Sequence, residues 1–257
     1  MVLSWLVCLA LVAVQEGSAS PIASGLVRSL DLEPPPGTWV QHFRLERAGA
    51  RADEAPLGLL RYVAGPDAEG GERVEVELQY LVDGMTLIHI EQASPERRRV
   101  VFREVRARGG RTLFLEGHSG VGWSGYELGG PEVVRHELAG GELPLFLIEA
   151  VRRGSALPEE MAVLDPLAAT DELLKLATRS NGEERVFEAR RADGSLRWRV
   201  SARGAELVEW RFQERGPAAR AIPSEEYREL REQHELAMSA VREAAAAKMR
   251  DPATLLR

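Results

Sequence analysis

Residues 74–80 read Val74-Glu75-Val76-Glu77-Leu78-Gln79-Tyr80, an unbroken alternation of apolar and polar side chains. Successive side chains of a β-strand point to opposite faces, so this stretch predicts a strand with one apolar face and one wet face. It is the clearest of a series of such runs that extends from Trp39 to Gln213. Strands rather than helices therefore decide the fold.

Ten further stretches show the same period of two, and in the first of them Trp39, Phe43 and Leu45 share one face. Turn dipeptides separate the runs, which predicts antiparallel hairpins. The stretches are Trp39–Arg47, Leu57–Val63, Thr86–Glu91, Val100–Ala107, Thr112–Glu116, Val133–Leu138, Leu173–Thr178, Arg185–Arg191, Leu196–Ala202 and Glu206–Gln213, and the turns are Asp83-Gly84, Gly109-Gly110, Asn181-Gly182, Asp193-Gly194 and Arg203-Gly204.

Two segments have helical spacing instead. Leu143–Arg153 is apolar nearly all round and is followed by Gly154, a typical residue after a helix end, so we expect a buried helix. The second helix is predicted from Ser224, a good N-cap, to about Met249, on a surface rather than in a core. Its narrow apolar stripe consists of Tyr227, Leu230, His234, Ala237, Val241 and Ala244 or Ala245.

The predicted fold class is mainly β, within the α+β group. About eleven strands do not stay flat, so we expect a strongly curved antiparallel sheet or incomplete barrel, with Leu143–Arg153 in its concavity. The predicted organisation is a signal peptide at 1–19, a flexible N-terminal segment at 20–38, a half-barrel domain at 39–223, and the C-terminal helix and tail at 224–257.

The N-terminus favours export. The apolar run Val2–Val14 is shorter than a membrane span and is followed by small residues, with cleavage expected after Ala19. Cys8, the only cysteine, lies inside this run, so the mature chain has no disulfide or thiolate ligand. The formal charge of −7 becomes −6 without Glu16, which argues against nucleic-acid binding. We expect a bacterial periplasmic or extracellular protein without a transmembrane anchor after cleavage.

Two motifs resemble catalytic or cofactor signatures without their context. Gly120–Gly125 matches the spacing of a dinucleotide-binding loop, but Gly129-Gly130-Pro131 leaves no room for the helix that such a loop needs. We therefore interpret this stretch as a glycine-rich loop or bulged strand. Ser119 and Ser124 each lie in a near-match to the nucleophile elbow, where again no helix follows, and a serine hydrolase remains a third alternative.

Other polar clusters have simple explanations. His89 and Glu91 share one face of a strand and could bind a metal with a further ligand, but a solvent-facing strand produces the same pattern. Arg97-Arg98-Arg99 fits a solvated hairpin turn, with an anionic headgroup site as the alternative. We predict no metal site and no cofactor.

The order of signal, long meander, mid-chain helix and closing hairpins resembles the LolA/LolB-like periplasmic lipoprotein carriers. The resemblance rests on Val74–Tyr80, Val100–Glu116, Leu143–Arg153 and Arg185–Gln213, and it is one of architecture, without a residue-level match. It implies a curled sheet and covering helices around a cavity for acyl chains. The long charged helix after the last strand departs from that family.

The leading hypothesis is a non-enzymatic envelope protein that binds a lipid, an acyl chain or another apolar ligand in the half-barrel. The rival hypothesis is an interaction module that docks an envelope protein through the Tyr227, Leu230 and Val241 face of the C-terminal helix, with a solvent-filled or side-chain-filled barrel as scaffold. The candidate cavity-lining residues are Trp39, Phe43, Val76, Leu78, Tyr80, Leu145, Phe146 and Ile148.

Overall fold

The structure is a computed structural model that describes residues 36–51, 54–67, 70–82, 84–106, 109–118, 122–214 and 216–250. The predicted signal peptide, nearly all of the predicted N-terminal segment and the tail after Arg250 lie outside these ranges. Within them the chain forms fourteen strands and two helices. The strands are β1 Trp39–Glu46, β2 Gly58–Pro66, β3 Glu72–Tyr80, β4 Thr86–Ala93, β5 Arg98–Arg106, β6 Gly109–His118, β7 Gly122–Leu128, β8 Val134–Leu138, β9 Glu160–Asp165, β10 Thr170–Asn181, β11 Glu184–Arg190, β12 Leu196–Arg203, β13 Glu206–Arg211 and β14 Ala218–Ile222.

All fourteen strands belong to one antiparallel sheet, in the order β8-β7-β6-β5-β4-β3-β2-β1-β14-β13-β12-β11-β10-β9. Two meanders are joined where the first strand pairs with the last, with Phe43 opposite Ala221. In the described residues β8 and β9 are the two edges, and the sheet is not closed. The prediction of a mainly β, antiparallel, incompletely closed fold is confirmed, but the predicted number of about eleven strands is too low.

The three strands that the sequence pattern missed are β7, β9 and β14. The described part of the stretch interpreted as a glycine-rich loop or bulged strand, Gly122–Gly125, lies in β7, whose glycines interrupt the apolar alternation. Gly125 is required there because a Cβ at this position would collide with the backbone carbonyl of Phe114. In β14 alanines replace the large side chains that mark a strand.

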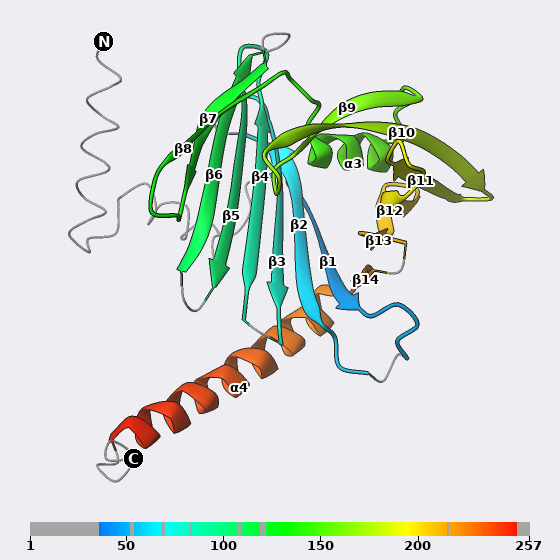
Figure 1. The fold of residues 1–257 in the computed structure, drawn as a ribbon. Coiled ribbons are helices and arrows are strands. Elements are labelled where there is room, and N and C mark those ends of the chain that lie inside the picture. The colour runs from blue at the N-terminus through cyan, green and yellow to red at the C-terminus, as the bar shows by residue number, and fades with distance from the viewer. Residues whose placement is uncertain are drawn as a thin grey trace. The chain divides into compact units, whose positions relative to one another are not determined.

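The sheet curls around helix α3, Pro144–Arg153 (Figure 1). This helix contacts β3, β9 and β12, although four strands separate β3 from β12 in the sheet. In a flat sheet five strand spacings of about 4.8 Å put these strands about 24 Å apart, which is more than the 10–12 Å diameter of a helix. The two halves of the sheet must therefore face each other across α3, as predicted for Leu143–Arg153.

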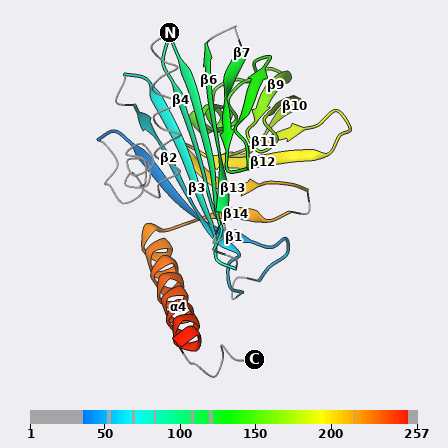
Figure 2. The same cartoon turned by 60° about the vertical axis from the view of Figure 1, so that its left-hand side comes forward.

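Both predicted helix boundaries agree with the structure. Helix α3 has Pro144 in its first turn and ends at Gly154, which takes the left-handed conformation with φ of 77°. Helix α4, Ser224–Arg250, touches β1 with its first turns and then extends away from the sheet (Figures 1 and 2). Neither of these two described helices has the length and apolarity that a membrane crossing requires.

Candidate functional site

The predicted lining residues all lie on the concave face of the sheet or on α3, and the structure brings them into one cluster. Phe43, Val76, Leu78, Leu145 and Ile148 are buried. Trp39, Tyr80 and Phe146 are half-buried and pack against the same cluster. The period-two pattern therefore identified the inward face correctly.

Side chains fill this concavity. Phe43 is 0% exposed and Ile148 1%, and the cluster extends without a break from β1–β3 through α3 to β10–β14. Two hollows formed by the described residues open to the surface: one of about 700 Å³ at β9 and β10, and one of about 330 Å³ beside β1 and β14. Of the predicted lining residues only Trp39 borders either of them.

A glutamate from the sheet caps the first turn of α3. The residue before the helix, Leu143, has no side chain that can cap it. Instead Glu91 Oε2 accepts a hydrogen bond from the Phe146 N–H at 3.0 Å, and Glu91 is fully buried. A carboxylate at a helix N-terminus satisfies a free backbone donor and interacts favourably with the helix dipole.

His89 approaches the other oxygen of Glu91, with 3.0 Å between Nε2 and Oε1. The two atoms are not aligned for a hydrogen bond. The alternative that His89 and Glu91 face solvent is wrong, because both lie on the concave face beside α3. Among the described residues there is no group of three or more His, Cys, Asp or Glu side chains that could hold a metal ion.

A second polar cluster holds the middle and end of α3. Glu149 is 2% exposed and accepts hydrogen bonds from the Tyr62 hydroxyl at 3.1 Å, from Arg152 Nε at 2.7 Å and from Arg153 Nε at 2.6 Å. Arg153 also pairs with Glu72 on β3. The buried carboxylate is therefore fully paired, as a charge in an apolar interior must be.

The pKa values of this cluster follow from its geometry. Burial alone raises the pKa of Glu149, but the hydrogen bonds and charges of Arg152 and Arg153 outweigh it, and the pKa lies below its usual value of 4.5. Burial, followed by the neighbouring Glu149 charge, raises the pKa of Tyr62 well above 10. The carboxylate is therefore ionised and the phenol neutral at pH 7. The guanidinium of Arg152 also lies 4.2 Å from the ring centre of Trp39.

The junction between α4 and the sheet is built on His42. Its Nδ1 lies 3.1 Å from Ser224 Oγ, and its ring lies 4.3 Å from that of the buried Tyr227. Burial and then the charges of Arg61 and Arg228 lower the pKa of His42 to about 4, so the imidazole is neutral at pH 7. The sequence pattern did not identify this contact, because its partners lie 182 residues apart.

The candidate nucleophile Ser124 is exposed on β7, opposite Glu116 on β6 and Glu137 on β8. It therefore lies within a strand and not on a turn into a helix. Ser119 lies outside the described residues. The arginine run falls at the start of β5, where Arg97 pairs with Glu116 and Arg98 with Glu142.

These features define a mainly β protein with an open antiparallel sheet and a polar-anchored helix in its concavity. No family model matches the chain, and no curated protein matches it. A solved structure titled as a beta-barrel-like protein of domain of unknown function DUF1849 from Brucella abortus has a TM-score of 0.49 and 11% identity to it. The match covers 73% of this chain and 95% of that one.

Proposed function

We propose that this chain is an exported, non-enzymatic protein that binds a lipid, an acyl chain or another apolar ligand in its half-barrel, and that α3 is a plug which the ligand displaces. The observation that carries the proposal is that one ten-residue helix occupies the apolar concave face. Polar contacts hold the helix along its length: Glu91 binds its start, Tyr62 its middle and Glu72 its end. Such contacts can re-form with water when the helix leaves.

The energies of plug and ligand are comparable. Four buried apolar side chains of α3 (Leu145, Leu147, Ile148 and Val151) each gain about 1.5–3 kcal/mol from burial, or about 6–12 kcal/mol together. An acyl chain gains about 0.8 kcal/mol for each buried CH₂, so a chain of about 16 carbons reaches about 12 kcal/mol. We therefore expect long chains to displace α3 and chains of about eight carbons, worth about 6 kcal/mol, to bind weakly.

Hydrogen exchange on the full chain tests this directly. Purified protein is titrated with palmitate and with octanoate, and amide exchange is followed along the chain. An ordinary ligand slows exchange around its site, whereas a ligand that displaces a plug speeds exchange in Pro144–Arg153 while it slows exchange in β1–β3. We expect this opposed pattern with palmitate only. If palmitate does not bind, or binds while α3 keeps its protection, the proposal is wrong.

A second candidate function is partner docking through α4. Tyr227 is buried against β1, but Leu236, about two and a half turns further along, is 72% exposed. Most of the helix thus extends beyond its contact with the sheet (Figure 2). Deleting the chain from Glu229 onward and measuring the mass by light scattering tests this role: lost association with an intact fold favours docking. If the full-length protein is already a monomer, the deletion cannot lower its mass, and this result argues against self-association through α4.

A further inference from the structure

The edge strand β9 is much shorter than its neighbour β10. Their ladder runs from Thr170 opposite Asp165 to Lys175 opposite Glu160, and one more hydrogen bond joins the Leu176 N–H to the Glu159 carbonyl at 2.7 Å. Strand β10 continues to Asn181, and over this last part it is paired with β11 alone in the described residues. An edge of five residues, 177–181, is therefore available beside β9.

The backbone of this edge points its hydrogen-bonding groups outward. The N–H groups of residues two apart in a strand point to the same side. Because the Leu176 N–H points toward β9, the N–H groups of Thr178 and Ser180 point to that side too, past the end of β9. Ala177, Thr178, Arg179 and Ser180 are all exposed. The edge thus offers two donors and two carbonyl acceptors to an added strand.

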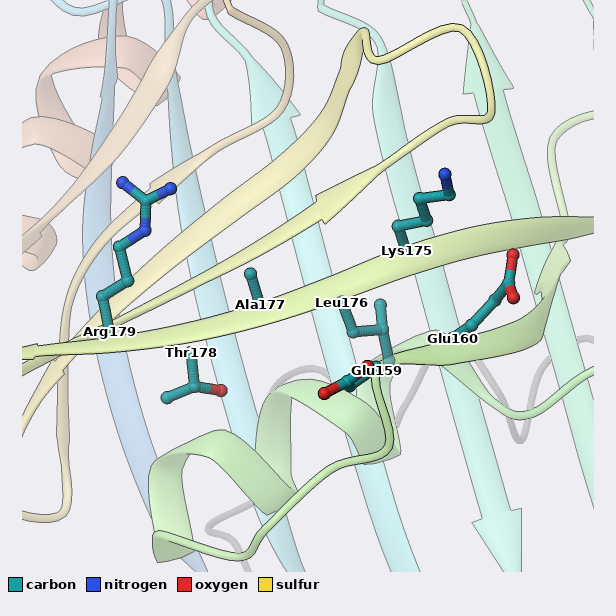
Figure 3. A pocket seen from close by; sticks show the side chains of 7 residues that line it. All are labelled: Glu159, Glu160, Lys175, Leu176, Ala177, Thr178 and Arg179. Atoms are coloured by element: carbon teal, nitrogen blue, oxygen red, sulfur yellow. The ribbon is translucent and has the colours of Figure 1, made fainter.

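A hollow lies at this edge. It has a volume of about 700 Å³ and is lined by Glu159, Glu160 and residues 175–179. Figure 3 shows Lys175, Ala177 and Arg179 on one side of β10, and Leu176 and Thr178 on the other. A strand placed along the edge would set its alternate side chains beside these two rows.

The charges at the edge select what it can bind. Lys175 lies across from Glu160 in the ladder. Arg179 lies opposite Val186 on β11, and Glu188, two pairs along the ladder, is bound by Arg190 at 3.0 Å. In the described part of the chain Arg179 has no ion-pair partner within 4.0 Å, so a positive charge at the end of the edge is unmatched.

We propose that the edge of β10 at residues 177–181 binds an extended peptide segment of a partner protein, which adds to the sheet as a further strand. The segment carries an acidic side chain opposite Arg179 and a small or aliphatic one beside Thr178. Strand addition of this kind takes its affinity from backbone hydrogen bonds and its specificity from alternate side chains. A second copy of the chain fits less well, because it would set two Arg179 side chains on one face.

Fluorescence polarisation with the full chain tests the proposal. The probes are labelled octapeptides of alternating Glu and Val, of alternating Lys and Val, and a Glu–Val peptide with N-methylated backbone. We expect the Glu–Val peptide to bind at least about tenfold more tightly than either of the others. In hydrogen exchange it should protect the Thr178 and Ser180 amides, which exchange freely without it.

Variants assign the site. Thr178→Pro removes an edge donor that β11 does not use, and should weaken binding about tenfold or more, whereas Thr178→Ala keeps the donor and should bind normally. Arg179→Glu leaves the backbone unchanged and should reverse the preference toward the Lys–Val peptide. Arg203→Glu, an exposed charge reversal on β12, is the matched control.

The proposal is overturned if the Glu–Val peptide does not bind, if Arg179→Glu leaves the preference unchanged, or if protection falls elsewhere in the sheet. Self-association that Thr178→Pro abolishes would also overturn it, because the edge would then pair with a second copy. None of these outcomes depends on whether an apolar ligand displaces α3.

Discussion

The hydrogen bond between Tyr62 and Glu149 is the most direct test of how α3 is held in the sheet. Tyr62→Phe removes one hydroxyl from a side chain that is 0% exposed and leaves its ring in place. Glu149 keeps its bonds from Arg152 and Arg153, so no unpaired charge is left. The loss is therefore that of a single hydrogen bond to a charged acceptor, about 1.5–3 kcal/mol of the free energy of unfolding.

Urea unfolding followed by circular dichroism measures this change. The midpoint should fall while the slope with denaturant stays the same, because the surface exposed on unfolding does not change. Tyr126→Phe on the outer face of β7 is the matched control and should lie within about 0.5 kcal/mol of the parent. If the displaced state of α3 also lacks the hydrogen bond, palmitate affinity should rise about 10-fold to 100-fold in Tyr62→Phe.

Two results would refute this reasoning. A stability change in Tyr62→Phe no larger than that of Tyr126→Phe would mean that the hydrogen bond does not hold α3. The expected loss of stability, if it comes with an unchanged affinity for palmitate, would mean that Tyr62 anchors α3 but that the ligand does not displace it.

Three further predictions concern the other anchors. Glu91→Ala leaves the Phe146 N–H without its acceptor and should cost about 1–3 kcal/mol, with faster amide exchange in the first turn of α3. The pKa of Glu149 is lower in the folded chain than its ordinary 4.5, so the unfolded chain binds more protons below that pH. The free energy of unfolding should therefore fall on acidification below about 4.5, and it should fall less steeply in Glu149→Gln. Urea unfolding at a series of pH values measures this. His42 should titrate near pH 4 by NMR. Because its pKa in the folded chain lies below the ordinary 6.5, the stability that the neutral imidazole contributes is lost as the pH falls from 6.5 to about 4. His42→Gln should remove this pH dependence of the free energy of unfolding.

The sequence pattern predicted those elements whose signal is local. Strands such as β3 alternate large apolar and polar residues, and glycines after tight turns mark their ends; Gly182 and Gly194, for example, have positive φ of 62° and 83°. Helix α3 could be predicted because apolar residues lie on nearly all of its sides and because Gly154 follows its last residue. The sequence pattern missed β7 because its glycines, one of which a close backbone contact requires, interrupt the alternation. It missed β14 because alanines carry little signal.

The anchors of α3 could not be predicted, because each depends on a partner far away in the sequence. In the sequence Glu91 resembles any polar residue of a strand with one solvent-exposed face. It caps α3 only because the fold places Phe146, which lies 55 residues later in the chain, beside it. Likewise the bond from Tyr62 to Glu149 spans 87 residues. Periodicity assigns a residue to a face of the sheet but does not reveal which element covers that face.

The polar anchors also bear on why a buried plug carries charge at all. Apolar residues in place of the whole group, Glu149 together with Arg152, could fill the space without the cost of burying charges, and such replacements often stabilise a protein. Apolar packing alone, however, permits a helix to slide or rotate in a smooth concavity, whereas the Glu149 and Glu91 contacts fix its rotation and its depth. A helix held in this way has one well-defined seated position and a definite set of bonds to break when it leaves. If α3 were only core, replacing the whole group by apolar residues (Glu149→Leu, Arg152→Leu and Tyr62→Phe) should be neutral or stabilising, since Arg153 keeps its pair with Glu72. If α3 is a plug, the same variant should also bind palmitate more weakly than the parent, because a larger apolar contact must then be displaced.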